Sequence, residues 1–523
     1  MDVEQTVTEF KGLLERQKML SSAMAVMGFD SNTIAPKGSV KAQGKRNGFF
    51  GLEIYKLTTS EAMKNCLDVL GQNLDSLDEI TRAEYRRAKK NYDKSTKIPA
   101  ELVKRQSELR AEANAAWDVA RQNNDFASYA PFLKELIDLQ KEALSYRTEP
   151  GQSPYDVLLD DYEEGMNAEI YDGFFNQLKA VIVPLLKMVT NSPYQVDTSF
   201  LSNTVSKDIQ QQIAKFIAEK VGYDLNRGYI GESTHPFCNG SDKTDVRITT
   251  RYREDDFQSS FYGVLHESGH ALYEQNIADD INDTILGGGV SMGIHESQSR
   301  FVENVIGRSL PFWENVTDEL KTFLPESFKA ITPRQFYEAV NTAGPSLIRV
   351  EADELTYSLH ILIRYEIEKL LFTTDVNIND LPQIWNQKYE DYLGLTPPTD
   401  TLGVLQDIHW SWGAFGYFPT YALGSAYSAQ LLSYMKRDLD VDALIGKGDL
   451  TTIVGWLTEN IHQYGSLRTP TQLIKDIAGE GLDASYYTDY LVKKFGELYK
   501  LNTTVGERHG FDTLLSVNAQ EIA

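Results

Sequence analysis

Two histidines, His266 and His270, stand four residues apart in the segment 264–273, and Glu267 directly follows the first. Residues four apart lie on one face of an α-helix, so the two imidazoles can hold one metal ion only if this segment is helical. Glu267 then lies about 100° round the helix, where its carboxylate can reach a metal-bound water without becoming a ligand itself. The spacing predicts a helix that carries a metal site of the zinc-hydrolase kind.

Apolar residues around the pair predict that this helix is partly buried. Phe261, Val264, Leu265 and Leu272 recur at helical spacing. A single histidine on such a face is more often a core residue, but two histidines with a glutamate between them rarely are. A zinc ion held there would lower the pKa of its water to about 7, and Glu267 would act as the general base.

The third ligand is expected in a second helix, which follows a glycine-rich break and begins near Ile294. Glu296, Arg300 and Glu303 share one face of that helix, so either glutamate could supply a carboxylate ligand. No histidine follows His270 at the spacing of the three-histidine motif. Two histidines and one carboxylate are therefore the favoured ligand set.

Composition narrows the classes of partner and compartment. A formal net charge of -24 argues against nucleic acid or an anionic membrane as the main partner. There is no stretch of 18 or more apolar residues and no basic leader before an apolar core, which predicts neither a membrane span nor secretion. Two cysteines, Cys66 and Cys238, are too few for a disulfide framework and predict reduced thiols in a cytoplasmic protein.

Amphipathic helices are predicted on both sides of the metal segment, which gives a mainly α-helical fold. We expect one unit, residues 1–523, with an N-terminal helical part (1–225), a metal site and substrate groove (226–425) and a C-terminal helical part (426–523). After Pro99, a position that suits the first turn of a helix, apolar residues recur at i+3, i+4 and i+7. These residues are Leu102, Leu109, Ala113, Ala116, Trp117 and Ala120.

Two further segments bear on the predicted site. Val246, Ile248 and Thr250 alternate with polar residues, which predicts a short strand, and Asn239-Gly240 suggests the turn of a hairpin. This hairpin could pair with an extended substrate or merely cover the core, and the pattern favours neither.

Residues 348–372 are expected to form one long helix. The segment Gly403–Leu423 spaces aromatic residues with glycines, which suits a loop that lines a pocket or a packed corner of the core. Its polar residues Asp407, His409 and Tyr421 favour the pocket, because burial alone would disfavour them.

Six motifs in this order resemble those of the M32 family of metallocarboxypeptidases, the carboxypeptidase Taq type. They are His235-Pro236-Phe237, Asp245-Val246-Arg247-Ile248-Thr249, His266-Glu267-Ser268-Gly269-His270, His295-Glu296-Ser297-Gln298, Ile348-Arg349-Val350-Glu351-Ala352-Asp353 and Gly403-Val404-Leu405-Gln406-Asp407-Ile408-His409-Trp410. The resemblance implies a helical, saddle-like subunit with a deep groove, and a homodimer. It also implies one zinc or cobalt ion per subunit. The small hairpin or sheet expected beside the active-site helix rests on the strand pattern above.

The resemblance assigns the third ligand to Glu296 and leaves Glu303 as an outer or structural group. Asp353 and Asp407 are candidates for orienting the ligating histidines. The implied reaction releases single C-terminal amino acids from peptides by attack of activated water on the last peptide bond, with Glu267 transferring the proton.

Substrate-binding residues follow from the need to recognise a free C-terminal carboxylate, which a guanidinium does best. Arg349 is our first candidate and Arg247 the second, although Arg247 could equally be a structural partner of an acidic group. His235 is a further expected substrate contact. His409 and Tyr421 are the candidates for stabilising the oxyanion.

Two alternatives remain at this point. A dipeptidyl carboxypeptidase or an oligopeptide endopeptidase could use the same metal site and groove. A non-catalytic helical binding protein with a degenerate site is the alternative from another class, and the intact Glu267 argues against it.

Overall fold

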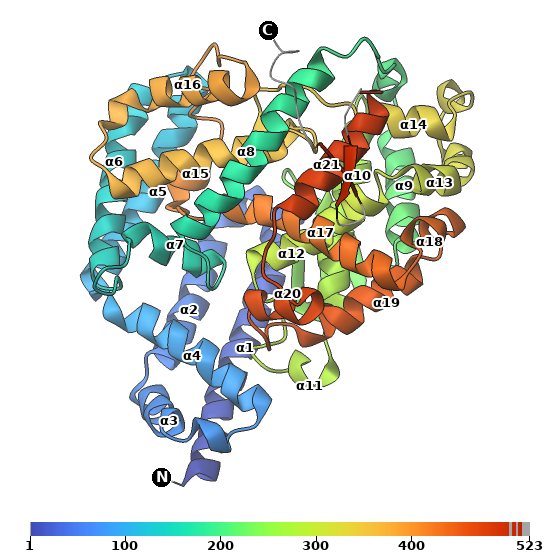
Figure 1. Ribbon diagram of the computed structural model, residues 1–523. Coiled ribbons are helices and arrows are strands. Elements are labelled where there is room, and N and C mark those ends of the chain that lie inside the picture. Colours follow the sequence, from blue (N-terminus) through green and yellow to red (C-terminus); the bar gives the residue numbers. More distant parts are fainter. Residues whose placement is uncertain (1, 502–504, 509–510, 515–523) are drawn as a thin grey trace. The chain divides into compact units, whose positions relative to one another are not determined.

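Two compact units make up the chain, and helices dominate both (Figure 1). The computed structural model describes residues 2–501, 505–508 and 511–514, which contain 21 α-helices. The first unit combines Met1–Thr96, Asp197–Val340 and Tyr434–Gly479, and the second combines Lys97–Val196, Asn341–Ser433 and Glu480–Ala523. Our division into 1–225, 226–425 and 426–523 follows sequence order and stays a prediction.

The first unit holds the helix of the two histidines, a three-stranded sheet and the helices around them. Its helices are α1 (Val3–Thr33), α2 (Val40–Thr58), α3 (Glu61–Gly71), α4 (Glu79–Lys97), α9 (Lys207–Lys220), α10 (Phe257–Gln275), α11 (Asp279–Asn282), α12 (Met292–Arg300), α13 (Leu310–Phe323), α14 (Pro333–Val340), α18 (Val441–Lys447), α19 (Leu450–Asn460) and α20 (Pro470–Ala478). Its strands are β1 (Gly228–Glu232), β2 (Cys238–Asp242) and β3 (Asp245–Thr250).

The predicted hairpin exists, but its turn lies elsewhere. Strands β2 and β3 pair antiparallel, with Cys238 opposite Ile248, and β1 adds to the other side of β3 in parallel. Asn239-Gly240 lies inside β2, so the predicted turn there is wrong. The chain reverses at residues 243–244, where the side chain of Asp242 accepts hydrogen bonds from the backbone and hydroxyl of Thr244. An aspartate that bonds two residues ahead stabilises such a turn.

One face of β3 packs on α10. Val246, Ile248 and Thr250 are fully buried, and the Thr250 hydroxyl donates to the carbonyl of Ser260 in α10 at 3.3 Å. Alternation along the strand turns these three side chains to the same face. The predicted small sheet beside the active-site helix is therefore confirmed.

The close crossing of α10 and α12 depends on Gly269. A Cβ atom at this position would lie 2.5 Å from the Cα atom of Ser299, so a larger residue would push the helices apart. α12 continues as a π-helix, Phe301–Ile306, a form often found at functional sites. Glu296 in α12 and Glu303 in the π-helix are thereby held against the histidine helix.

The second unit is a set of packed helices with a short two-stranded ribbon. Its elements are α5 (Ala100–Asn123), α6 (Phe126–Ser145), α7 (Pro154–Tyr162), α8 (Ala168–Thr190), α15 (Tyr357–Thr373), α16 (Leu381–Leu393), α17 (Pro419–Asp438), α21 (Ser485–Leu498), β4 (Val505–Arg508) and β5 (Phe511–Leu514). The predicted stripe on α5 is largely confirmed, because Leu102, Leu109, Ala113, Trp117 and Ala120 are buried.

Two expectations for this unit were wrong. The helix expected over 348–372 begins at Tyr357, and Arg349 lies in a separate 3-10 turn. The Asp353 carboxylate accepts from the backbone N–H groups of Leu355 and Thr356, at 2.9 and 3.0 Å, a local turn that competes with helix at this point. We also expected helices up to the C-terminus, but β4 and β5 pair antiparallel.

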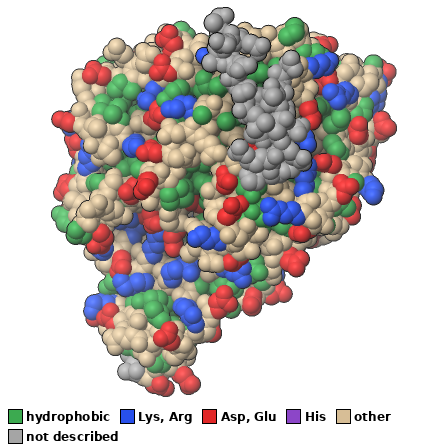
Figure 2. Space-filling model, in the orientation of Figure 1, with side chains coloured by type: hydrophobic (Ala, Val, Ile, Leu, Met, Phe, Trp, Pro, Cys, Tyr) green, Lys and Arg blue, Asp and Glu red, His purple; other side chains and the backbone are tan. Residues whose placement is uncertain are grey.

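None of the helices among the described residues combines the length and the apolar character that crossing a membrane requires. Figure 2 shows acidic, basic and hydrophobic side chains interspersed over the face in view.

Candidate metal centre

Three side chains of the first unit converge as metal ligands would. His266 and His270 lie on one face of α10, as predicted, and the Nε2 atoms of both lie 3.5 Å from Oε2 of Glu296. One nitrogen from each histidine and one oxygen of Glu296 all lie within 4.8 Å of one another. Two imidazoles and a carboxylate are a common protein ligand set of catalytic zinc, so these residues fit a divalent ion.

Glu303 faces the other side of His266. Its Oε2 atom lies 2.9 Å from Nδ1 of His266, and Arg300 lies between the two glutamates, 2.7 Å from Glu296 and 3.2 Å from Glu303. The spacing alone left both glutamates open as ligands. Because Glu296 meets both Nε2 atoms and Glu303 meets the outer nitrogen, the geometry favours Glu296 as the ligand and Glu303 as the group that orients His266.

The charges of this cluster favour a cation. Burial raises the pKa of Glu296, but Arg300 and His266 outweigh it and hold the pKa below its ordinary value. The same balance lowers the pKa of Glu303, so both carboxylates are ionised. Burial lowers the pKa of His266, yet Glu296 and Glu303 raise it to about 9. Negative charge that attracts a proton to this imidazole also attracts a divalent metal ion.

A third histidine, His295, for which no role was predicted, lies against His270. Nδ1 of His270 lies 2.7 Å from Nδ1 of His295, and Nε2 of His295 lies 2.8 Å from Oε1 of Glu274. His295 directly precedes Glu296, and Glu274 stands four residues after His270 on α10. That helical spacing was the available signal for Glu274.

Glu267 is buried beside the ligands, with 5% of its surface exposed. Burial raises its pKa to about 7, and the charges of Glu296 and Glu303 act in the same direction against that of His266. A carboxylate with a pKa near neutrality can both accept and return a proton, which is what a general base needs.

The second unit contains a buried cluster of two arginines around one aspartate. Arg349 lies 2.8 Å from Oδ1 of Asp407, and Arg364 lies 2.7 Å from Oδ2. Although burial raises it, the two arginines hold the pKa of Asp407 below its ordinary value. One carboxylate thus faces two guanidinium groups, and one positive charge is left in excess in this cluster.

His409 and Tyr421 lie beside the same cluster. Nε2 of His409 lies 3.3 Å from the Tyr421 hydroxyl, and the Tyr421 ring lies under Arg349 at 5.2 Å. Nδ1 of His409 is buried without a hydrogen-bond partner among the residues that the structure describes. Burial, together with Arg349 and Arg364, lowers the pKa of His409 to about 4, so this imidazole is neutral at pH 7.

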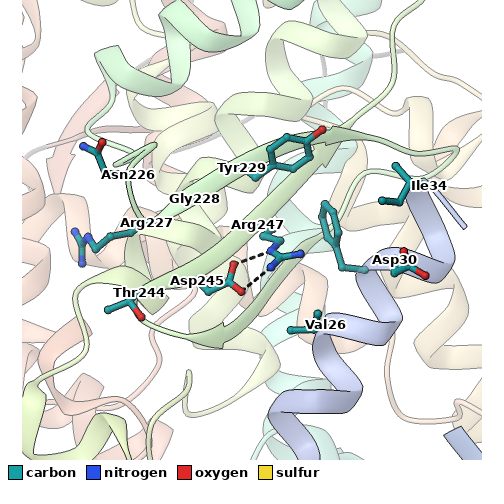
Figure 3. Close-up of a pocket in the computed structure, with 11 residues that line it drawn as sticks. Val26, Asp30, Ile34, Asn226, Arg227, Gly228, Tyr229, Thr244, Asp245 and Arg247 are labelled. Atoms are coloured by element: carbon teal, nitrogen blue, oxygen red, sulfur yellow. Dashed lines mark hydrogen bonds and ion pairs between the residues drawn. The ribbon is translucent and has the colours of Figure 1, made fainter. Parts of the chain in front are cut away.

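Arg247 pairs with a residue outside the candidate metal ligands, and His235 lies at the surface. Arg247 extends from β3 on the face opposite Thr250 and pairs with Asp245 at 2.6 and 2.7 Å, as Figure 3 shows. It borders a cavity of about 490 Å³ between α1 and the sheet, and it stands over the Phe29 ring. His235 is exposed. The pairing supports the structural alternative for Arg247, and the substrate role of both residues stays a prediction.

Asp353 and Asp407, which were expected to orient the ligating histidines, bind other groups. The Asp353 carboxylate accepts from two backbone N–H groups just before α15, and Asp407 binds Arg349 and Arg364. The outer nitrogens of the two histidines meet Glu303 and His295 instead, so the expectation for Asp353 and Asp407 was wrong.

Comparison with known proteins decides the family. The model of the carboxypeptidase Taq (M32) metallopeptidase family matches residues 9–495. The chain belongs to this family. It is 44% identical over 502 residues to carboxypeptidase 1 of Bacillus subtilis, which covers 96% of this chain and 100% of the relative. It is 36% identical over 507 residues to thermostable carboxypeptidase 1 of Thermus thermophilus, covering 94% and 99%.

Solved structures agree with this membership. Metallocarboxypeptidase 1 of Trypanosoma cruzi has a TM-score of 0.91 at 33% identity, covering 94% of this chain and 99% of that one. The M32 carboxypeptidase of Deinococcus radiodurans has a TM-score of 0.90 at 35% identity, covering 95% and 99%. The resemblance stated from the motifs is confirmed, as is the mainly α-helical fold class, and the chain is a metal-dependent carboxypeptidase of the hydrolase class.

Proposed function

We propose that the chain releases single C-terminal amino acids from peptides, using one divalent ion held by His266, His270 and Glu296. The observation that carries the proposal is the convergence of both Nε2 atoms on one carboxylate oxygen, at 3.5 Å each. When bound, a divalent ion supplies Lewis-acid activation of water and of the scissile carbonyl. Zinc is our first choice, because two imidazoles and a carboxylate suit it, and cobalt is the second.

Glu267 moves the proton in this proposal. It takes a proton from the attacking water and gives it to the leaving amine as the peptide bond breaks. A pKa raised to about 7 supports both steps, because the carboxylate is then basic enough to accept the proton and acidic enough to return it.

Arg349 binds the terminal carboxylate of the substrate. Arg364 is fully buried and already donates to several partners: the His360 carbonyl, the Tyr389 hydroxyl, Gln406 and Asp407. Because Arg364 balances the negative charge of Asp407, the positive charge of Arg349 remains to be neutralised. A buried excess charge is costly unless an anion meets it, and a carboxylate fits the guanidinium fork. Arg247 and His235 are secondary candidates for substrate contact.

His409 and Tyr421 stabilise the oxyanion of the transition state. A neutral imidazole keeps one N–H donor, and the low pKa of His409 keeps it neutral. The phenol of Tyr421 is a second donor within 3.3 Å of that ring. Loss of one such donor typically costs about 10²- to 10³-fold in rate.

A homodimer in the cytoplasm completes the proposal. The α1–α2 hairpin exposes Met19, Ile34, Val40, Phe49 and Leu52, each at 50% or more. Several exposed large apolar side chains on one helical hairpin favour a protein partner, and a second copy is our choice. The free thiols Cys66 and Cys238 support a reducing compartment. We expect no nucleic-acid partner, because the chain carries a net charge of -24.

The decisive experiment combines metal analysis with mass spectrometry of a digested peptide. Stepwise loss of single C-terminal residues, together with about one zinc or cobalt per chain, supports the proposal. Loss of residue pairs would indicate a dipeptidyl carboxypeptidase, and internal cuts would indicate an endopeptidase. Unchanged hydrolysis after exhaustive chelation would remove the role of the metal.

A further inference from the structure

The outer nitrogen of His270 is connected to the partly buried carboxylate of Glu274 through the imidazole of His295. His270 meets His295 at 2.7 Å, nitrogen to nitrogen, and His295 meets Glu274 at 2.8 Å. The three side chains are 16%, 24% and 16% exposed, respectively, so the chain of contacts is largely shielded from water. Hydrogen bonds are stronger in such surroundings and depend more on correct donor and acceptor pairing.

Only one arrangement of protons satisfies the hydrogen bonds from His270 through His295 to Glu274 when His270 holds a metal ion. A ligating Nε2 atom must be free of its proton, so a neutral His270 carries the proton on Nδ1 and donates it to Nδ1 of His295. His295 then accepts at Nδ1 and donates from Nε2 to the carboxylate of Glu274. Each hydrogen bond fixes the donor and acceptor of the next, and the Glu274 carboxylate accepts the last one.

A tight loop, residues 287–289, holds the Glu274 end of this series of hydrogen bonds. The backbone N–H of Gly289 donates to the same Oε1 atom of Glu274 at 2.9 Å. A Cβ atom on Gly289 would collide with Cδ2 of His295, so glycine is needed for the loop to lie this close. Lys18 of α1 donates to the carbonyl of Gly287 at 2.7 Å and fastens the same loop. Glu274 and His295 are therefore placed by specific contacts from three segments.

We propose that His295 and Glu274 are positioning residues for the metal centre. They fix the ring of His270 with its Nε2 atom toward the ion and make that nitrogen a stronger ligand, as Glu303 does for His266. The inference rests on the metal site proposed above. Partners of this kind usually change metal affinity by about 10- to 100-fold when removed.

Glu274→Gln tests the charge with little change of shape. The amide oxygen can still accept from His295 and Gly289, but the negative charge is gone. We expect the Kd for zinc, measured by competition with a chromogenic chelator, to rise roughly 10-fold. His295→Phe should raise it further, up to about 100-fold. Asp283→Asn is the matched control, because it removes an exposed carboxylate near this loop and should leave the Kd unchanged.

The double variant separates positioning from general damage. Without His295, Glu274 has no path to His270, so adding Glu274→Gln to His295→Phe should change the Kd no further. The absorption spectrum of the cobalt-loaded protein should change in Glu274→Gln and not in Asp283→Asn. Additive losses, or a wild-type Kd in Glu274→Gln, would overturn the inference while the metal site stands. Failure of the wild-type chain to bind zinc would instead remove the proposed function.

Discussion

Nε of Arg349 lies 2.9 Å from Oδ1 of Asp407, and Arg364 occupies the other oxygen of that carboxylate. Asp407 therefore keeps one partner when Arg349 is removed, which makes a clean test possible. Arg349→Ala should raise KM for peptides with a free C-terminus roughly 100-fold, as expected for the loss of a charge-assisted bond of about 3 kcal/mol. Zinc content should stay unchanged.

Amidated peptides supply the control for this variant. Wild-type protein should hydrolyse an amidated peptide far more slowly than the free acid, and Arg349→Ala should act on both at similar rates. Arg349→Lys keeps the charge but loses the planar fork, so its KM for the free acid should lie between those of the wild type and Arg349→Ala. Equal wild-type activity toward free and amidated peptides would rule out the docking role.

Glu267→Gln should separate metal binding from turnover. Glu267 is buried beside the ligands but meets neither Nε2 atom as Glu296 does. The variant should keep its zinc, measured by atomic emission, and lose about 10²- to 10⁴-fold in kcat, because the amide cannot accept the proton of water. Zinc loss in proportion to the loss of activity would make Glu267 a ligand and contradict the proposed division of roles.

Glu296→Gln and Glu303→Gln test which glutamate binds the ion. We expect Glu296→Gln to lose most of its zinc affinity, and Glu303→Gln to lose about 10- to 100-fold, because Glu303 acts through His266. Zinc should also raise the Tm of the wild-type chain, since an ion bound only by the folded state stabilises it. A larger loss in Glu303→Gln than in Glu296→Gln would reverse the assignment.

The proposed metal ligands could be identified from the sequence because the spacing of the two histidines is local. His266 and His270 lie one helical turn apart, so any helix brings them together, and Glu296 stands in a recognisable motif. The partners of Arg349 could not be read in this way. Arg364 and Asp407 come from distant segments, and only the packing of α15 against the 407 loop joins them.

The outer contacts of the centre and the strand turn were missed for different reasons. The i+4 spacing places Glu274 on the face of His270, but its contact with His295 depends on the close crossing of α12 over α10 at Gly269, which has no short-range signal. Asn239-Gly240 has the composition of a hairpin turn, but pairing with β3 keeps it in the strand. Tertiary pairing outweighed local preference at this position.

A buried glutamate outside the metal centre should make stability depend on pH. Glu368 is fully buried and accepts from the Tyr155 hydroxyl at 3.0 Å, and from Trp410 Nε1 and the Gly416 N–H at 2.8 Å each. Burial raises its pKa from 4.5 to about 7 despite these three donors. The folded state therefore holds this proton more tightly than the unfolded state does, so its contribution is most favourable at low pH.

The sign of the effect follows from the two pKa values of Glu368. Stability from this group should fall as pH rises from 4.5 to about 7 and stay constant above that, a loss of roughly 3 kcal/mol. Glu368→Gln stays neutral throughout, so its free energy of unfolding relative to wild type should improve by about that amount between pH 4.5 and pH 8. Urea unfolding at both pH values measures it, with the exposed Glu390→Gln as control. Parallel pH curves for all three proteins would show that Glu368 does not hold its proton.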